Sequence, residues 1–387
     1  MFCFSLNKRG SSPNLIIFTM KFSQLANPRI LDQPTYQPGR PIEEVAKEQG
    51  IDPGDICKLA SNENPWGASK AARDAARDAL DDVHRYPDGS SLVLREKLAK
   101  HHKLSPDQFI IGNGSNEIIE LIGHVFLNEE DEVLFGEYAF IVYKLVSLLM
   151  GAKPVCAPMP GLRHDLQQMK KLITERTKLV FLPSPNNPTG TSNTEDEIFS
   201  FVRDLPDHII FCLDEAYAEY LEHSPDLRTL LQEGKKVMGL RTFSKIYGLA
   251  GLRIGYGYGS VELIKLLQQA RQPFNANAIA LAAATAALDD QAWVEECRQK
   301  NNAGMQQLQD ACDQLNLPWI PSDANFLLIK IGDGQKAFHE LQALGVITRP
   351  MPQGLEQYIR ISIGTTQENE IAISAIKKVL PILKNPA

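Results

Sequence analysis

One lysine stands in a glycine-rich stretch whose residue types suit amine chemistry. Lys245 lies among apolar, small and hydroxyl residues, and Arg253 follows it eight positions later. An ammonium group held among apolar side chains loses hydration, so its pKa falls and its amine becomes a usable nucleophile. Such an amine can form a Schiff base with a carbonyl compound.

The neighbours of Lys245 suit a phosphate ester. Thr242 and Ser244 carry hydroxyl donors, and Arg253 offers a planar, permanently charged fork. The stretch also contains glycines that permit close backbone approach and sharp turns, Gly248, Gly251 and Gly255. The simpler alternative is a buried loop with one lysine that lays its stem along apolar surface and one surface arginine.

Three other loops carry polar groups directly after apolar runs. The turn over residues 112–116 precedes a helical pattern, so its backbone N–H groups could hold a phosphate, although many strand-to-helix turns look like it. Residues 183–190 are rich in proline and asparagine and by themselves indicate a turn. Asp214 and Glu215 follow a fully apolar run, where a carboxylate usually has a cationic partner.

An α/β pattern must position these loops. Short, continuously apolar runs alternate with helical patterns, which predicts a mostly parallel sheet covered by helices on both faces. The strands predicted in this sheet are 109–111, 132–135, 153–155, 178–182, 209–213 and 237–240. Ligands of open parallel sheets bind outside the carboxyl ends of the strands, so we expect the candidate loops to gather at that edge.

The same pattern suggests how the chain divides. We expect an N-terminal extension and arm over residues 1–50, a large domain over 51–275 and a smaller C-terminal α/β domain over 276–387, with the arm packed nearby. Residues 1–19 have too short an apolar run for a secretory signal and no clear cleavage site. Met20 is a candidate alternative start, which would make residues 1–19 an upstream extension.

Composition narrows the class of protein. A formal net charge of −7 without a basic block argues against a nucleic-acid surface. The six cysteines are scattered, which favours a reducing cytoplasm over a disulfide framework or a zinc site. The eight histidines form no metal-binding pattern, so we expect no metal, and no apolar run is long enough for a transmembrane helix.

Four motifs together resemble those of the fold-type I, pyridoxal-phosphate-dependent aminotransferases. They match in order and spacing: Asn-Pro-Thr-Gly at 187–190, Asp-Glu-Ala-Tyr at 214–217, Ser-Lys at 244–245 and Ala-Gly-Leu-Arg at 250–253. The resemblance covers nearly everything from about residue 30 to the end. It implies a transaminase with a large domain built on a mostly parallel sheet, a smaller C-terminal domain, and pyridoxal 5′-phosphate as the cofactor.

The resemblance also implies roles for single residues. Lys245 would form the Schiff base and later move a proton, while Asp214 would pair with the pyridine nitrogen of the cofactor. Tyr217 and Asn187 would bind the phenolic oxygen of the ring. The residues implied around the cofactor phosphate are Arg253, Thr242, Ser244, Ser115 and Asn116.

Two aromatic positions complete the implied cofactor site. Phe140 matches the aromatic residue that stacks on the ring in this family, with Tyr138 as the alternative if the register slips by two. Tyr86, in Arg85-Tyr86-Pro87, matches a tyrosine that reaches the cofactor phosphate of the neighbouring subunit, which implies a homodimer.

Within this superfamily the chain looks most like the histidinol-phosphate aminotransferases of histidine biosynthesis. The motifs that carry this likeness lie at 34–39, 60–65, 85–87 and 358–365. Arg360 would hold the phosphate of histidinol phosphate or imidazole-acetol phosphate, or the carboxylate of glutamate or 2-oxoglutarate. Arg349, Tyr36 and Asn187 would complete that site, although Arg349 could also be a solvated charge at a strand end.

Other activities occur on the same scaffold. An aminotransferase for phenylalanine or tyrosine would use the same arginine for a carboxylate, and a threonine-phosphate decarboxylase would use the same cofactor. A non-catalytic regulator is a further alternative, but such regulators carry an N-terminal DNA-binding module, for which this chain has neither the room nor the basic charge.

Overall fold

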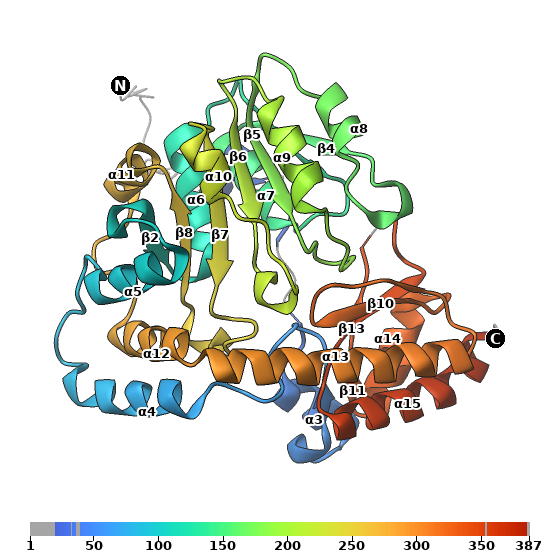
Figure 1. Ribbon diagram of the computed structural model, residues 1–387. Helices are drawn as coiled ribbons and strands as arrows, with labels where there is room; N and C mark the ends of the chain where they lie inside the picture. The colour runs from blue at the N-terminus through green and yellow to red at the C-terminus, as the bar shows by residue number, and fades with distance from the viewer. Residues whose placement is uncertain (1–19, 32, 36–38, 353, 385–387) are drawn as a thin grey trace, which may run out of the picture.

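A mostly parallel sheet forms the centre of the larger part of the molecule. The structure, a computed structural model, describes residues 20–31, 33–35, 39–352 and 354–384. Seven of its strands pair in the order β2-β8-β7-β6-β5-β3-β4 (Figure 1). They are β2 (Phe109–Gly112), β3 (Glu132–Gly136), β4 (Lys153–Ala157), β5 (Thr177–Pro183), β6 (Ile210–Asp214), β7 (Val237–Thr242) and β8 (Gly255–Gly259). The six predicted strands and the α/β fold class are confirmed.

Helices cover both faces of this sheet because its strands are apolar on both sides. Phe181 of β5 packs in one cluster with α6, α7 and α11, whereas its neighbour Leu182 packs in the other with α5, α9 and α12. The first three helices are α6 (Gly114–Phe126), α7 (Val142–Met150) and α11 (Val261–Ala270), and the other three are α5 (Leu92–His102), α9 (Glu195–Arg203) and α12 (Ala278–Asp289). Two short helices, α8 (Leu166–Lys171) and α10 (Arg228–Gln232), join the second cluster.

Strand β8 was not among the strands that the sequence predicts, because its sequence is Gly-Tyr-Gly-Tyr-Gly. It runs antiparallel to both β2 and β7 and is the exception in the sheet. Its glycines make room for close neighbours: a Cβ on Gly257 would lie 2.3 Å from Cε of Met238, and one on Gly255 would lie 2.8 Å from the backbone N of Ser115. Helix α6 can therefore begin directly against β8.

A second, smaller body contains an antiparallel sheet in the order β12-β13-β10-β9. Its strands are β9 (Trp319–Ile320), β10 (Phe326–Lys330), β12 (Arg349–Pro350) and β13 (Tyr358–Ser362), and they pack with α14 (Gly334–Ala343) and α15 (Thr366–Lys384). The N-terminal part of the chain joins this body, since β1 (Cys57–Lys58) pairs in parallel with β11 (Val346–Ile347). Helix α3 (Ile42–Gln49) packs there through Val45 and Ala46.

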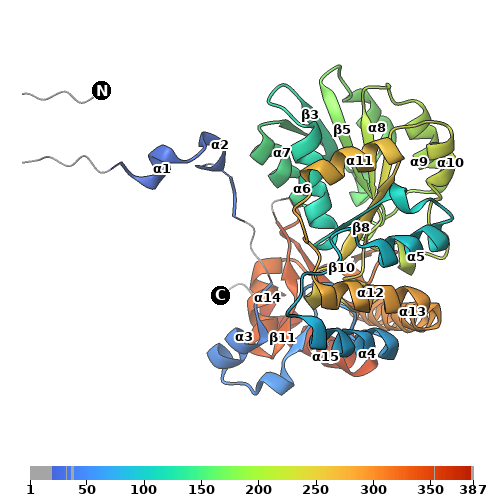
Figure 2. The ribbon, with the colours of Figure 1, turned by 90° about the vertical axis from the view of Figure 1, so that its left-hand side faces the viewer.

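One long helix connects the two bodies. The first half of α13 (Gln291–Gln314) contributes Val294 and Cys297 to the core of the large sheet, and its second half contributes Leu308 and Cys312 to the small body (Figure 1). Helix α12 packs beside α4 (Lys70–Asp78) on the large body (Figure 2). The predicted boundary at residue 276 stays a prediction.

The described part of the N-terminal arm extends away from the rest of the chain and contacts the large body at α7. Its short helices are α1 (Phe22–Leu25) and α2 (Pro28–Leu31), which lead away from the rest of the chain in Figure 2. Arg29 donates a hydrogen bond to the carbonyl of Met150 at the end of α7 (3.3 Å). Among the described residues, none of the helices combines the length and the apolar character needed to span a bilayer.

Candidate active site

The predicted site loops meet at one edge of the large sheet. Strands β2, β5, β6 and β7 all end there, because β5, β6 and β7 are parallel and β2 shares their direction through the antiparallel strand β8 between them. The loop that carries Lys245 follows β7, and Asp214 is the last residue of β6. The topology therefore brings the lysine and the carboxylate together, as the sequence predicts.

Lys245 lies between the large body and the 60–62 stretch of the chain. Its Nζ donates to the carbonyl of Ser61 (3.3 Å) and lies 5.5 Å from the ring centre of Tyr217. Enclosure by protein, with the positive charge of Arg360 as a second cause, lowers the pKa of Lys245 to about 8. About one Lys245 amine in ten is therefore neutral at pH 7, far more than for a free lysine.

Asp214 is buried, and the hydrogen bonds that it accepts stabilise its charged form only in part. Its carboxylate accepts from the hydroxyl of Tyr143 (2.6 Å) and from the backbone N–H of Ala216 (3.1 Å). Burial raises the pKa of Asp214 to about 6, and the bond from Tyr143 opposes that rise. Next to Asp214, the carboxylate of Glu215 forms an ion pair with Arg241 (3.0 Å), so the expected cationic partner belongs to Glu215.

Tyr217 is buried close to Lys245, and its hydroxyl is bound by the 60–62 stretch of the chain. The oxygen accepts a hydrogen bond from Nδ2 of Asn62 (2.8 Å), and the ring meets the ring of Phe326 edge-on (5.3 Å between centres). Burial raises the pKa of Tyr217 to about 12, so its hydroxyl stays protonated at neutral pH.

The predicted phosphate loop forms a cradle around Arg253. Its guanidinium donates to Oγ of Ser244 (3.3 Å) and to the carbonyl of Asn113 (3.5 Å). A Cβ on Gly114 would lie only 2.7 Å from Nη2 of Arg253, so the arginine sits directly against the beginning of α6. The first backbone N–H groups of a helix and its dipole favour an anion at this place.

Three other residues predicted around the phosphate differ in surroundings. Ser115 is buried at the start of α6, and Asn116 is exposed one residue later. Thr242 is buried, and its Oγ1 accepts from the backbone N–H of Ser244 (3.1 Å) and donates to the carbonyl of Ile254 (3.4 Å). Thr242 therefore stabilises the turn before Lys245 with the hydroxyl that the resemblance assigns to the phosphate.

The predicted substrate arginine reaches the site from β13 of the small body. Arg360 is 8% exposed, donates to the carbonyl of Ala60 (2.7 Å) and to Oδ1 of Asn187, and lies over the ring of Phe326. Arg349 of β12 stands directly opposite Arg360 in the antiparallel register. Two like charges at opposite positions favour an anion near them. Tyr36, the third predicted member, lies outside the described residues.

The predicted aromatic residues differ in their surroundings. Phe140 meets Tyr143, the partner of Asp214, edge-on at 6.0 Å, while the carbonyl of Tyr138 accepts from Nδ2 of Asn186 (3.1 Å). Which of the two stacks on a cofactor stays a prediction. Tyr86 is 83% exposed and stacks on Phe274 with 4.8 Å between ring centres.

Two residues of the site were missed by sequence reasoning. Tyr143 lies on α7 three residues after Phe140, and nothing in its apolar helical surroundings indicates a bond to Asp214. Asn62 belongs to the 60–65 motif but carried no predicted role. Its backbone has a φ of 54°, a conformation that asparagine tolerates better than most residues, and this is the only local signal.

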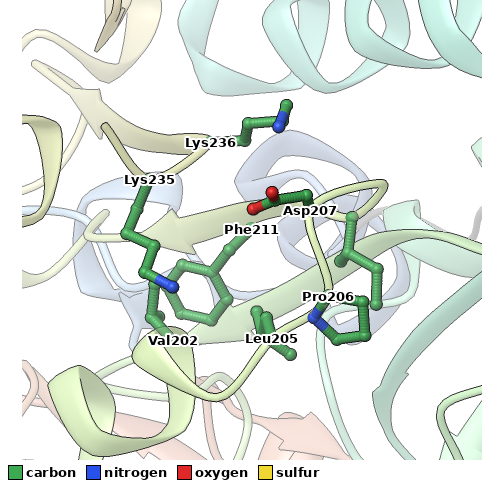
Figure 3. Close-up of a pocket in the computed structure, with 8 residues that line it drawn as sticks. Val202, Leu205, Pro206, Asp207, Phe211, Lys235 and Lys236 are labelled. Carbon is green, nitrogen blue, oxygen red and sulfur yellow. The ribbon is translucent and has the colours of Figure 1, made fainter. Parts of the chain in front are cut away.

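A small pocket at the opposite edge of the sheet is a different place. It is lined by Leu205, Pro206, Asp207 and Lys235 near the N-terminal ends of β6 and β7 (Figure 3). None of the predicted site residues lines it. We therefore place the candidate active site at the carboxyl edge, around Lys245.

Comparison with known proteins agrees with this geometry. Residues 54–376 match the family described as aminotransferase class I and II. A histidinol-phosphate aminotransferase of Akkermansia muciniphila is 43% identical over 363 residues, 93% of this chain and 100% of that protein. A histidinol-phosphate aminotransferase 2 of Pseudomonas fluorescens is 44% identical over 93% of this chain and 98% of its own length.

Solved structures show the same fold. The histidinol-phosphate aminotransferase of Sinorhizobium meliloti, in complex with pyridoxal-5′-phosphate, has a TM-score of 0.86 and 27% sequence identity over 92% of this chain and 98% of its own. An aspartate aminotransferase of Thermus thermophilus with maleate has a TM-score of 0.80 at 22% identity. The chain belongs to the class I and II aminotransferase family.

Proposed function

We propose that this protein is a pyridoxal-phosphate-dependent aminotransferase that transfers an amino group between histidinol phosphate and 2-oxoglutarate, with imidazole-acetol phosphate and glutamate as the products. One observation carries the proposal. Lys245 and Arg360, from the two bodies, donate to the consecutive carbonyls of Ser61 and Ala60. A nucleophilic amine and an anion-binding arginine therefore face one site, which is what amino transfer to an anionic substrate needs.

The residues present fit the cofactor. The buried carboxylate of Asp214 has a pKa raised to about 6 by burial, so a nearby cation such as a protonated pyridine would stabilise its charged form. The cradle of Arg253, Ser244 and the start of α6 offers a guanidinium, a hydroxyl and helix N–H groups to one phosphate. Lys245 supplies the amine for the aldehyde.

Each of these residues then has a task in the reaction. The bound cofactor supplies a carbonyl that condenses with amines and a ring that withdraws electrons from the substrate. With its lowered pKa, Lys245 would supply a neutral amine to that carbonyl and could carry a proton at Nζ. Asp214 would hold a negative charge for the ring nitrogen, and Tyr217 and Asn187 would bind the phenolic oxygen of the ring.

The substrate assignment is supported by the arginines and by the relatives. Arg360 and Arg349 stand opposite each other, and a guanidinium fork binds a phosphate or a carboxylate equally well. One site can thus accept histidinol phosphate in one half-reaction and glutamate in the other. The two curated relatives described above, at 43% and 44% identity, are both named histidinol-phosphate aminotransferases.

We also propose a cytoplasmic homodimer in which Tyr86 reaches the cofactor phosphate of the partner subunit. Tyr86 and Phe274 form an exposed aromatic pair. A groove of about 450 Å³ lies beside them and is lined mostly by apolar residues such as Leu281 and Val93. Contact with a second copy of the chain would bury this apolar surface.

Substitution of Lys245 tests the proposed chemistry. Lys245→Ala removes the amine, and Lys245→Arg removes it while the positive charge stays, so both variants should lose turnover by roughly three orders of magnitude or more. Both should also lose the visible absorbance that the cofactor gains on the wild-type protein. A Lys245→Ala protein that transaminates at the wild-type rate would overturn the assignment.

A further inference from the structure

The stretch Leu59–Glu63, here called the bridging segment, connects the two bodies through its carbonyl groups. The carbonyls of Leu59 and Ala60 accept from β13 of the small body, from the backbone N–H of Ser362 (2.8 Å) and from Arg360 (2.7 Å). The next carbonyl, that of Ser61, accepts from Lys245 of the large body (3.3 Å). The carbonyls of Asn62 and Glu63 both accept from Nδ2 of Asn325 (3.0 and 3.3 Å). This segment is therefore fixed residue by residue between the lysine and the small body.

Asn62 has the most constrained position in the bridging segment. It is 1% exposed and adopts the left-handed backbone conformation (φ 54°). Such a conformation in a non-glycine residue is retained only where the surrounding structure enforces it, and it concentrates at functional sites. The side chain of Asn62 faces two hydroxyls, those of Ser362 and Tyr217.

The hydrogen bonds of Ser362 match one orientation of the Asn62 amide. Oγ of Ser362 accepts from the backbone N–H of Asn62 (2.8 Å), so its own hydrogen can donate to Oδ1 of the same residue (3.2 Å). With Oδ1 used as an acceptor there, the NH₂ group of Asn62 faces the oxygen of Tyr217 (2.8 Å). Tyr217 thus accepts from Asn62, and its own O–H hydrogen is left for a different acceptor.

We propose that Asn62 is a positioning residue that makes Tyr217 a hydrogen-bond donor toward the cofactor, and that Ser362 sets the orientation of Asn62. The inference rests on the proposed function, because the acceptor is the phenolic oxygen of the cofactor. Ser362 lies two residues after Arg360 on β13, so both side chains project from the same face of the strand. The strand that carries the substrate arginine is thereby connected to the tyrosine at the cofactor.

Two variants of Asn62 distinguish the role of its side-chain amide from that of its backbone conformation. Asn62→Gly keeps the left-handed conformation without strain and removes the NH₂ donor. Asn62→Asp keeps the shape of the side chain but offers a carboxylate, which accepts the hydrogen of Tyr217 and withdraws it from the cofactor. The readout is the pH titration of the visible absorbance of the bound cofactor, because a donor to the phenolic oxygen favours the deprotonated chromophore.

We expect the midpoint of that titration to rise by about one pH unit in Asn62→Gly and further in Asn62→Asp. In a Tyr217→Phe background, Asn62→Gly should cause no additional shift, because the hydroxyl that it positions is gone. Asn325→Ala is the matched control, since the Nδ2 group of Asn325 donates to the backbone of the bridging segment and not to Tyr217. Its midpoint should stay at the wild-type value.

The outcomes distinguish this inference from the proposed function. Unchanged midpoints in both Asn62 variants, or an equal shift in Asn325→Ala, would overturn the positioning role while the absorbance of the wild-type protein keeps the cofactor assignment. A shift that persists undiminished in the Tyr217→Phe background would also overturn it. A wild-type protein that gains no visible absorbance with the cofactor would refute the proposed function itself.

Discussion

Burial shifts the pKa values of Asp214 and Lys245 in opposite directions. Burial raises the pKa of Asp214 to about 6 and lowers that of Lys245 to about 8, so each group is less readily charged than in water. Tyr143 offsets part of this effect on Asp214 through its hydrogen bond of 2.6 Å. The pKa of Asp214 therefore depends on the hydroxyl group of Tyr143, which a substitution by phenylalanine removes while the ring stays.

Tyr143→Phe should move the pH at which the protein loses its cofactor. The ring still stacks on Phe181 (4.6 Å between centres), but the pKa of Asp214 rises without the hydroxyl bond. Cofactor affinity of the wild type should fall as the pH drops through about 6, and in Tyr143→Phe this fall should begin about one unit higher. Absorbance titrations with pyridoxal 5′-phosphate from pH 5 to 8 measure it.

Tyr256→Phe is the control for this titration, because the hydroxyl of Tyr256 binds His102 (2.8 Å) and not Asp214. It should leave the pH dependence of cofactor affinity unchanged. Identical profiles for Tyr143→Phe and the wild type would show that Tyr143 does not influence Asp214.

The buried amine of Lys245 should destabilise the folded protein when the cofactor is absent. Its folded-state pKa of about 8 lies below the unfolded value of 10.5, so the folded state binds fewer protons between these values and wild-type stability rises with pH across that window. Lys245→Met should therefore be more stable than the wild type at pH 7, by about 1–3 kcal/mol, while it is inactive. Urea unfolding of the cofactor-free proteins measures the difference.

The gain from Lys245→Met should shrink by pH 10, because the wild type has then lost most of the cost of burying a charged amine. Lys265→Met, at an exposed position of α11, controls for the substitution itself and should show no such pH-dependent gain. A difference between Lys245→Met and wild type that is the same at pH 7 and pH 10 would contradict the assigned cause.

At the level of elements, the start of α6 and the turn after β7 form the anion cradle. Gly114 has a φ of 73°, and a Cβ there would meet Arg253 at 2.7 Å. Gly114→Ala should displace the guanidinium and weaken cofactor binding by about tenfold, in addition to the cost of the left-handed conformation. Equilibrium titration with pyridoxal 5′-phosphate, together with a thermal unfolding curve, separates the two effects.

Gly234→Ala provides the matched comparison for the cradle. Gly234 has a φ of 75°, but an added Cβ would have no neighbour within 4 Å. It should lose a similar amount of stability from the backbone and keep its cofactor affinity. Equal losses of affinity in both variants would mean that the cradle is not where the cofactor phosphate binds.

The elements were predictable where their side chains form a regular pattern. The apolar runs of β5 and β6 predicted buried parallel strands, and the order of the strands then placed Lys245 beside Asp214. Strand β8 could not be predicted, because its glycines are required by neighbours distant in sequence, such as Met238. The site roles of Tyr143 and Asn62 could not be predicted for a related reason. Their partners, Asp214 and Tyr217, are brought to them only by the tertiary fold.

For the whole molecule, mixed dimers test whether Tyr86 acts across an interface. Tyr86→Ala and Lys245→Ala subunits are mixed under exchange conditions and assayed at a cofactor concentration where each alone is inactive. A hybrid dimer then contains one complete site, so random exchange should restore about a quarter of the wild-type activity. No recovery, in spite of hybrids detected by native mass spectrometry, would place Tyr86 in its own subunit's site or outside the sites altogether.

The relative specificity of the enzyme for two amino donors identifies its substrate. We would measure kcat/KM for histidinol phosphate and for phenylalanine, each with 2-oxoglutarate as the amino acceptor. We expect a preference for histidinol phosphate of at least about a hundredfold, because the guanidinium groups of Arg360 and Arg349 favour a phosphate-bearing substrate. A preference for phenylalanine would contradict it and assign the enzyme to aromatic amino acids, and turnover of neither substrate, with the cofactor absorbance intact, would favour a decarboxylase.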